Sequence, residues 1–303
     1  MTEKPFKADV PARSERISLL VASDNHYAIL IGALLKSIIT HHKTREPIDF
    51  YIIDDHITPL NKRKIQQIAD PRRVRVRWIN VHRLTPYISQ LPLDRSSFPK
   101  TIYFRIFAPH LIDTDVKKLI YLDVDTLVRT DISNLWNINL DPYVIGAVQD
   151  IGKTVTSRWG GIPNYQELGL TSDTKYFNSG VLLIDTEKWR RQQISNLIIE
   201  ALIKHHEHVV LPDQYGLNVV FANNWLELPP EWNWSAAADH ENPYLIHFLH
   251  IKPIFKSCYS KEQWKTEFFD YLNQTPWENF KPISEYKRKL RLSYNRAKKL
   301  LRL

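Results

Sequence analysis

Two aspartates separated by one residue stand at the end of an apolar run in this chain of 303 residues. Within KLIYLDVDTLVRTDISNLW (118–136), Ile120 and Leu122 predict a buried strand, and Asp123 and Asp125 follow at its far end. Their like charges repel, and burying carboxylates without partners costs free energy. A Mg²⁺ or Mn²⁺ ion would relieve this repulsion, because hard cations prefer oxygen ligands and keep positions open for phosphate oxygens. The spacing alone equally fits a strand end whose aspartates cap the next turn.

Other acidic residues follow other predicted strands. Asp24, Asp54 and Asp150 each stand at such a strand end, and Asp131 comes soon after the aspartate pair. In open α/β sheets, ligands collect at the carboxyl ends of parallel strands. The sequence contains neither G-x-G-x-x-G nor G-x-x-x-x-G-K-[ST], so it lacks the glycine-rich loops that cradle phosphates. A bound nucleotide diphosphate would therefore depend on a cation held by the aspartate pair.

The hydrophobic pattern that must position these residues alternates between strand-like and helix-like segments. Strands are predicted at 17–23, 48–54, 74–81, 117–125, 143–150 and 179–186. Helices are predicted at 27–42, 60–70, 101–109, 187–205 and 213–221. This alternation predicts an α/β fold with a Rossmann-like, mostly parallel sheet, right-handed crossovers and flanking helices.

Composition indicates where in the cell the protein is located and how the chain divides into segments. The single cysteine, Cys258, excludes an intramolecular disulfide and a cysteine-based zinc site, and it fits a reducing, cytoplasmic location. No apolar run reaches the roughly 18 to 20 residues needed to span a bilayer. We expect a polar N-terminal extension (1–16), which is too polar for a signal peptide, one α/β domain (17–275) and a basic C-terminal tail (276–303).

The positive charge is concentrated in the tail. Residues 284–303 carry eight Lys or Arg and one Glu, so they hold seven of the eight net positive charges of the chain. Apolar residues recur there every three or four positions, which would align them on one stripe of a helix: Tyr286, Leu290, Tyr294, Ala297 and Leu301. A basic amphipathic helix suits an anionic membrane surface, here the inner face of the cell membrane, at about 1 kcal/mol per basic residue. A solvated helix or a disordered end is the alternative, and nucleic-acid binding is disfavoured because no base-stacking platform accompanies the charge.

Seven stretches resemble, in order, those of glycosyltransferase family 8, the retaining nucleotide-sugar transferases that include bacterial lipooligosaccharide galactosyltransferases and glycogenin. They are VASDNHYAILIGALLKSI (21–38), YFRIFAP (103–109), LIYLDVDTLVRTDISNLW (119–136), YFNSGVLLIDTEKWR (176–190), LPDQYGLN (211–218), LPPEWNW (228–234) and IHFLHIKP (246–253). The resemblance implies a GT-A fold and a metal-dependent enzyme that uses Mn²⁺ or Mg²⁺. It also implies transfer of galactose or glucose from a UDP-sugar to a lipopolysaccharide, lipooligosaccharide or related glycan acceptor.

The resemblance assigns the donor contacts residue by residue. Ala22, Ser23, Asp24 and Tyr27 look like the uridine contacts, with the Asp24 carboxylate accepting from the uracil edge and the Tyr27 ring stacking on the base. An ordinary strand-to-helix cap is the alternative for this loop. The metal set would be Asp123, Asp125 and His247, of which Asp123 and His247 would also contact the donor. Without the family, His247 would read as a core histidine.

The sugar and the leaving group have their own implied contacts. Arg105 is similar to the arginine that reaches the donor sugar, although a helix-surface arginine is usually only a solvated charge. Asn178 and Ser179 would hydrogen-bond the sugar and Asp150 resembles an acceptor-pocket acid, although strand-end caps would look the same. Asp213 corresponds to the donor-sugar acid, Gln214 to the residue on the far face of the anomeric carbon, and Lys252 to the cation beside the leaving diphosphate.

Retention of configuration usually indicates double displacement by a carboxylate nucleophile. Glutamine is a poor nucleophile, so Gln214 favours departure and attack on one face, with the protein stabilising the diphosphate. The segment HFLHIKPIF departs from the family pattern: His250 replaces a glycine, Lys252 comes one residue early, and a tryptophan is absent. Tyr215 also replaces a common acid. These departures leave open a peripheral membrane or RNA-binding protein with a degenerate nucleotide pocket, and a metal-dependent thermal shift with UDP would separate the two classes.

Overall fold

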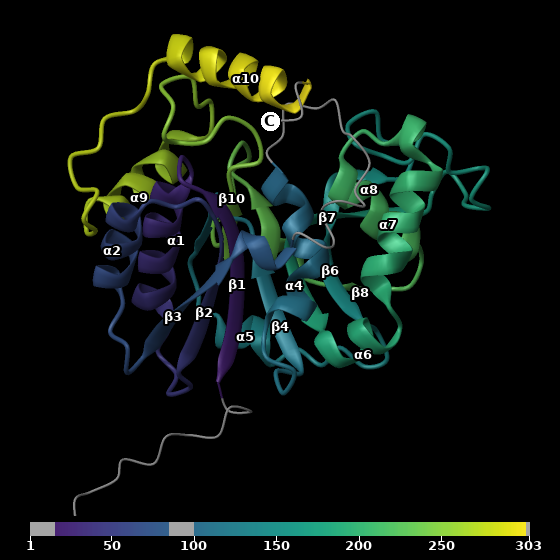
Figure 1. Ribbon diagram of the computed structural model, residues 1–303, viewed down its shortest axis with the longest axis horizontal. Helices are drawn as coiled ribbons and strands as arrows, with labels where there is room; N and C mark the ends of the chain where they lie inside the picture. Colours follow the sequence, from purple (N-terminus) through teal and green to yellow (C-terminus); the bar gives the residue numbers. More distant parts are fainter. Residues whose placement is uncertain (1–15, 85–99, 301–303) are drawn as a thin grey trace, which may run out of the picture.

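The computed structural model describes residues 16–84 and 100–300, and its central sheet carries the architecture (Figure 1). Within these residues, seven strands lie in the order β3-β2-β1-β4-β7-β6-β8. Their bounds are β1 (Ile17–Asp24), β2 (Ile48–Asp55), β3 (Val74–Asn80), β4 (Lys118–Leu122), β6 (Ile145–Thr154), β7 (Lys175–Asp185) and β8 (Leu226–Glu227). Strands β3, β2, β1 and β4 are parallel, whereas β7 is antiparallel to both β4 and β6. The predicted mostly parallel sheet is confirmed, with β7 as the reversed strand.

Strand β1 shows why the sheet is covered on both faces. Leu19 and Val21 point into one hydrophobic cluster, and Leu20 and Ala22 point into another. A run of consecutive apolar residues, here Leu19 to Ala22, is typical of a parallel strand buried on both sides. Helices α1 (Ala28–His41), α2 (Pro59–Ile68) and α9 (Glu262–Leu272) contribute to the first cluster. Helices α4 (Phe104–Leu111), α6 (Thr186–Arg191), α7 (Ile194–Lys204) and α8 (Pro212–Val220) contribute to the second.

A second, small sheet supports the edge of the candidate site. Strand β10 (Leu245–His247) lies between β5 (Thr126–Val128) and β9 (Trp234–Ser235) in a three-stranded sheet. It is antiparallel to β5, with His247 opposite Thr126. This pairing places His247 next to the residues that directly follow Asp123 and Asp125. Short helical segments complete the described chain: α5 (Ser133–Trp136) and the 3₁₀ turns Val81–Leu84, Lys100–Tyr103, His206–His208 and Pro230–Asn233.

Several predicted bounds are corrected by the structure. The helix predicted at 187–205 is two helices, because Gln193 adopts a left-handed conformation (φ 54°) between α6 and α7. The strand predicted to end at 125 ends at Leu122, so both aspartates lie beyond it. The helix predicted at 101–109 begins at Phe104 and runs through Pro109 to Leu111, after a 3₁₀ turn.

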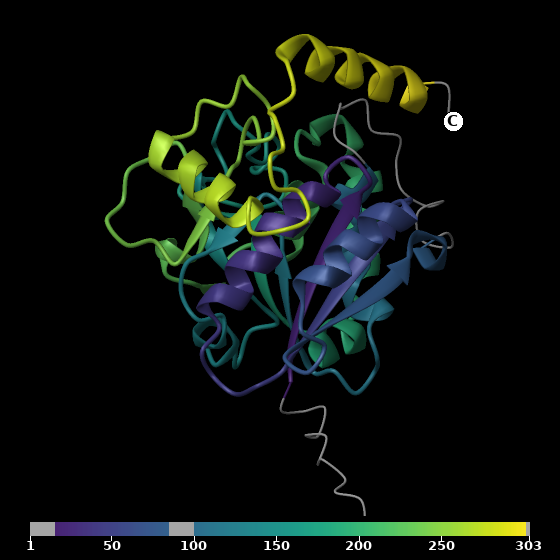
Figure 2. The same ribbon diagram turned by 90° about the vertical axis from the view of Figure 1, so that its left-hand side faces the viewer.

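The tail forms the predicted helix, α10 (Glu285–Leu300). Figures 1 and 2 both show α10 across the end of the molecule at which β1 terminates. Leu301 of the expected stripe and residues 1–15 of the expected extension lie outside the described residues. Arg16, also assigned to the extension, is buried and its guanidinium lies 2.8 Å from the Asp49 carboxylate of β2. None of the helices in the described ranges is long and apolar enough to cross a bilayer.

Candidate active site

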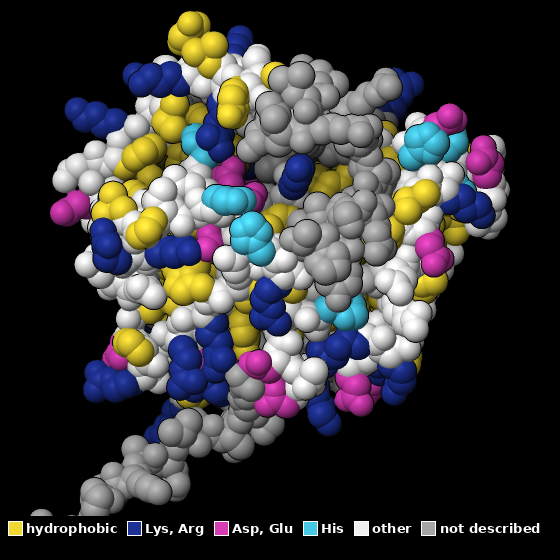
Figure 3. All heavy atoms as spheres, viewed as in Figure 1, with side chains coloured by type: hydrophobic (Ala, Val, Ile, Leu, Met, Phe, Trp, Pro, Cys, Tyr) yellow, Lys and Arg dark blue, Asp and Glu magenta, His cyan; other side chains and the backbone are white. Residues whose placement is uncertain are grey.

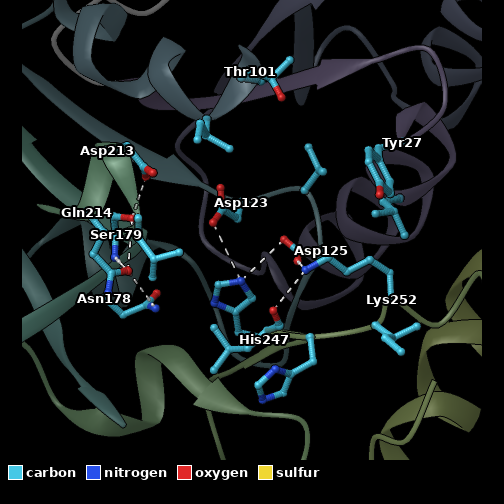
Figure 4. Close-up of a pocket in the computed structure, with 18 of the residues that line it drawn as sticks. Tyr27, Thr101, Asp123, Asp125, Asn178, Ser179, Asp213, Gln214, His247 and Lys252 are labelled. Carbon is cyan, nitrogen blue, oxygen red and sulfur yellow. Dashed lines mark hydrogen bonds and ion pairs between the residues drawn. The ribbon is translucent and has the colours of Figure 1, made fainter. Parts of the chain in front are cut away.

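A cavity of about 580 Å³ opens at the carboxyl ends of β1 and β4. Its size falls within the range of small-molecule sites in proteins, roughly 300–1,000 Å³. Every candidate residue from the sequence lines it: Ala22, Ser23, Asp24, Tyr27, Arg105, Asp123, Asp125, Asp150, Asn178, Ser179, Asp213, Gln214, His247 and Lys252. Figure 4 shows many of these side chains converging from separate elements. Segments more than 200 residues apart in the sequence thus meet in one pocket.

Two carboxylates and one imidazole form a compact set of oxygen and nitrogen donors. One ligand atom each of Asp123, Asp125 and His247 lies within 4.8 Å of the others. The Nε2 atom of His247 is 3.5 Å from an Asp125 oxygen and 3.8 Å from an Asp123 oxygen. This donor chemistry fits a divalent cation such as Mn²⁺ or Mg²⁺.

The orientation of His247 is fixed by Asn233, which precedes β9 and was not singled out in the sequence. The Nδ1 atom of His247 lies 2.8 Å from the Asn233 side-chain oxygen. With an oxygen acceptor there, Nδ1 carries the proton and Nε2 presents a lone pair to the aspartates. Asn233 in turn donates its amide to Asn178, at 2.8 Å. Such outer partners orient metal ligands. The one sequence signal for Asn233 is its place in the matched stretch LPPEWNW.

Gly180 provides the space for this set. A Cβ atom at this position would lie 2.3 Å from His247 Cε1 and 2.9 Å from an Asp123 oxygen. The Gly180 carbonyl also accepts the backbone N–H of Asp123, at 2.8 Å. Any other residue here would collide with the side chains of His247 and Asp123, so glycine leaves the space that these two side chains occupy.

The two aspartates differ in their electrostatic surroundings. Burial raises the pKa of Asp123, and the nearby Asp125 charge adds to the rise although Arg105 opposes it. Burial acts in the same direction on Asp125, but Lys252 and His247 outweigh it and lower the pKa of that carboxyl below its ordinary value. Lys252 forms a direct ion pair with Asp125 and donates to the Phe248 carbonyl at 2.9 Å. The site therefore pairs each of the two carboxylates with a nearby cation.

Arg105 is a buried side chain of α4 and not a solvated one. Its guanidinium donates to Asp123 at 2.8 Å and to the Ser179 carbonyl at 2.6 Å, and it lies 3.0 Å from Asp213. Burial alone would lower the pKa of Arg105, but the Asp123 and Asp213 carboxylates raise it above its usual value. Arg105 is thus a fixed cation that joins the acidic pair to α8.

A hydrogen-bonded group at the start of α8 surrounds Gln214. Its side-chain oxygen accepts from Ser179 N at 3.2 Å and from the Asn178 amide at 3.3 Å. Its Nε2 donates to Asp150 at 3.2 Å, and Ser179 Oγ donates to Asp213 at 2.9 Å. Gln214 is almost fully buried. Its carboxamide therefore has a defined orientation in the wall of the pocket.

At the other end of the pocket, Asp24 accepts hydrogen bonds from the turn that precedes α1 and also contacts the tail. One Asp24 oxygen accepts from the backbone N–H groups of His26 and Tyr27, both at 2.9 Å. The other lies 2.8 Å from a guanidinium nitrogen of Arg291 in α10. Arg291 was not predicted as a site residue, because its sequence context is only a run of basic residues.

Two other acids considered in the sequence lie outside the cavity lining. Asp54 pairs with Lys62 and accepts from Ile57 N at 2.6 Å. Asp131 accepts from the backbone N–H groups of Lys43 and Thr44, at 2.6 and 2.9 Å. Both carboxylates therefore make structural contacts outside the pocket.

Comparison with known proteins identifies the family of the chain. Residues 18–258 match the family model "Glycosyl transferase family 8". The chain belongs to glycosyltransferase family 8. The expected family is confirmed, and the protein is a glycosyltransferase of a retaining family.

Similar proteins come from several bacteria. General stress protein A of Bacillus subtilis is 29% identical over 88% of this chain and 96% of its own length. Glycosyltransferase GlyF of Streptococcus pneumoniae is 31% identical over 78% of this chain, and lipopolysaccharide 1,2-glucosyltransferase of Escherichia coli is 28% identical over 73%. The matches span 57% of GlyF and 62% of the glucosyltransferase.

Solved structures share the fold. The galactosyltransferase LgtC, in complex with donor and acceptor sugar analogues, superposes with a TM-score of 0.73 at 24% identity, over 90% of this chain and 99% of LgtC. The bifunctional glycosyltransferase WbbM superposes with a TM-score of 0.75 at 22% identity, over 88% of this chain and 51% of WbbM. The GT-A fold expected from the sequence is confirmed.

Proposed function

We propose that this protein is a metal-dependent retaining transferase that moves galactose or glucose from a UDP-sugar to a lipopolysaccharide, lipooligosaccharide or related glycan acceptor. The observation that carries the proposal is the convergence of Asp123, Asp125 and His247 beside a pocket of nucleotide-sugar size. Family membership supports glycosyl transfer. The names of the E. coli and LgtC relatives support a hexose donor and a glycan acceptor.

The three donor side chains would hold Mn²⁺ or Mg²⁺, and the ion would supply positive charge for the leaving diphosphate. Asn233 and Gly180 keep the donor side chains aligned. Lys252, now paired with Asp125, offers a second cation at the same place. Electrostatic stabilisation by such fixed charges is the main contribution we assign to the protein.

The walls of the pocket would orient the sugar for reaction on one face. Asp213 and Ser179 offer acceptors and donors to sugar hydroxyls, while Arg105 holds both in place. The Gln214 oxygen, held by Asn178 and Ser179, would face the developing positive charge at the anomeric carbon without forming a bond to it. Asp150 supports Gln214 from the acceptor side.

An aromatic rim at the pocket mouth supports a glycan acceptor. Trp159 and Tyr259 are 58% and 56% exposed, although both line the cavity. Their rings flank His250, with centroids 5.8 and 5.2 Å from the imidazole. Exposed aromatic faces suit the apolar faces of sugar rings. His250, which stands where the family has glycine, thus completes a surface for the acceptor.

The tail supports a location at the cytoplasmic face of the inner membrane. Tyr286, Leu290 and Tyr294 of α10 are 72%, 52% and 67% exposed. Figure 3 shows apolar and basic side chains together over α10. Co-sedimentation with phosphatidylglycerol vesicles should be lost when the three apolar residues are all replaced by serine. Retained binding by this variant would exclude the stripe as the membrane contact.

The central test is an assay of UDP release. The full-length protein would be incubated with Mn²⁺, UDP-galactose or UDP-glucose and a truncated lipooligosaccharide acceptor, with and without chelator. We expect acceptor-dependent UDP release that stops when the metal is removed. Full turnover in excess chelator would overturn the metal assignment, and no release with either donor would overturn the hexosyltransferase assignment.

A further inference from the structure

Helix α10 lies across the pocket with Arg288 and Arg291 turned inward. An Arg291 guanidinium nitrogen is 2.8 Å from Asp24, the last residue of β1. Arg288 and Leu292 of the same helix belong to the lining of the cavity. The N-terminal end of the helix is tied to the domain, because Ile283 N donates to the Ile254 carbonyl at 2.8 Å. The tail therefore forms one wall of the donor pocket.

The apolar stripe of α10 points away from this wall. At 3.6 residues per turn, Tyr286, Leu290 and Tyr294 fall on one side of the helix, and Arg288 and Leu292 fall on the opposite side. The three apolar side chains are exposed, whereas Arg288 is only 20% exposed. A helix packed on a protein in water normally buries its apolar face. Helix α10 instead exposes its apolar stripe, and its inner side carries Leu292 and the Arg291–Asp24 ion pair.

The polar contact between α10 and Asp24 leaves some buried polar atoms unpaired. Arg291 reaches only one Asp24 oxygen, because the other accepts from the backbone N–H groups of His26 and Tyr27. Within the described residues, Arg291 Nε and His26 Nε2 are buried without a hydrogen-bond partner. Unpaired buried polar atoms cost free energy, and a partly exposed ion pair returns little. The contact is therefore weak enough to open and close.

We propose that Arg291 is a positioning residue that latches α10 over the Asp24 end of the donor pocket, and that an anionic membrane surface releases the latch. The inference rests on the proposed UDP-sugar function. In the latched state Asp24 is held by Arg291 and is not free for a nucleobase. Arg291 lies on the flank of α10 between the stripe and the pocket, where lipid phosphates compete for its guanidinium once the stripe is docked.

The experiment measures UDP affinity by calorimetry in Mn²⁺ on the full-length protein. Four proteins are compared: wild type, Arg291→Gln, Arg291→Lys and Lys287→Gln. Lys287 is exposed on the same helix and does not line the cavity, so its substitution removes the same charge without touching the latch. Each protein is titrated with phosphatidylcholine vesicles and with vesicles that contain phosphatidylglycerol.

With neutral vesicles, we expect Arg291→Gln to bind UDP about two- to fivefold more tightly than wild type, the range of a partly exposed ion pair. Lys287→Gln and Arg291→Lys should match wild type. Anionic vesicles should tighten UDP binding by wild type to a similar degree and leave Arg291→Gln unchanged.

Other outcomes overturn the latch. Equal UDP affinity of Arg291→Gln and wild type would show that Arg291 does not hold the pocket closed, and weaker binding would make it a donor ligand instead. If neutral and anionic vesicles change the UDP affinity of wild type equally, an anionic membrane surface is not the signal that releases the latch. If no variant binds UDP at all, the proposed function itself fails, a result distinct from UDP binding that ignores residue 291.

Discussion

The two ends of the pocket are built differently. At the acidic end (Asp123, Asp125 and His247), the contacts come from the core sheets and from buried partners such as Arg105 and Asn233. At the tail-facing end (Asp24 and Tyr27), a partly exposed helix supplies the contact through Arg291. A rigid site suits charge stabilisation, which requires groups already in place. A weakly held helix suits a part of the pocket that must admit a ligand.

The largest expected effect comes from removing a donor at the acidic end. Asp125→Asn should reduce turnover by more than about 100-fold, because the proposed metal set loses one carboxylate and Lys252 loses its ion-pair partner. Acceptor-dependent UDP release at saturating Mn²⁺ measures this. Asp173→Asn, at an exposed position outside the cavity, serves as the control. Turnover within twofold of wild type in both variants would contradict a metal role for Asp125.

Loss of an outer partner should have a smaller effect. Asn233→Ala leaves all three donor side chains in place but frees the His247 ring, so Mn²⁺ affinity should fall roughly 10- to 100-fold. Calorimetric titration with Mn²⁺ would measure the change, with exposed Asn224→Ala as the matched control. Unaltered Mn²⁺ affinity would show that the ring orientation is set elsewhere.

A substitution in the pocket wall around Gln214, between the two ends, should reduce turnover less than the loss of Asp125. Gln214→Ala removes an oriented oxygen but no nucleophile, so kcat should fall by about 100-fold or less and activity should remain measurable. Complete loss, together with a covalent sugar adduct on Gln214 in the wild type by mass spectrometry, would instead support double displacement.

The aromatic rim should affect the acceptor alone. Trp159→Ala should raise the acceptor KM roughly two- to tenfold, from the free energy of one aromatic contact, and leave the donor KM unchanged. Leu60→Ala, at an exposed apolar position outside the cavity, should change neither constant. A change in the donor KM of Trp159→Ala would contradict the assignment of this ring to the acceptor.

The smallest effect is a titration at the tail-facing end. Burial and the adjacent Arg291 charge lower the pKa of His26 from 6.5 to about 4. In Arg291→Gln the charge repulsion disappears while burial persists, so the pKa of His26 should rise but stay below 6.5. Histidine NMR titration would follow this shift. An unmoved pKa would indicate that Arg291 is distant from His26 in solution.

The acidic end was more accessible to sequence reasoning than the tail-facing end. Asp123 and Asp125 follow a recognisable strand, Asp24 closes another and Asp150 ends the predicted strand 143–150, so strand periodicity places them at one sheet edge. In the structure β6 continues past Asp150 to Thr154. His247 and Gln214 emerged only through the family resemblance, because their neighbours are set by tertiary contacts. Asn233 and Gly180 were missed since an amide and a glycine carry no charge signal.

For the tail, the sequence predicts the helix but not its contacts with the domain. Periodicity predicted both the helix and its apolar stripe, but no local pattern indicates which side of a helix faces the domain. The Arg291–Asp24 contact joins residues 267 positions apart, and only the folded chain reveals it. Gln193 likewise separates α6 from α7 through a left-handed backbone conformation that its residue type does not favour.

The outward stripe of α10 has a geometric consequence for the acceptor. An α-helix with its side chains is about 10–12 Å thick. If the stripe rests on a bilayer, the helix becomes a spacer, and the aromatic rim lies at a stand-off from the lipid surface set by that thickness. The outer sugars of a membrane glycan would then reach the pocket, whereas the sugars next to the lipid anchor would lie too close to the bilayer to enter the pocket.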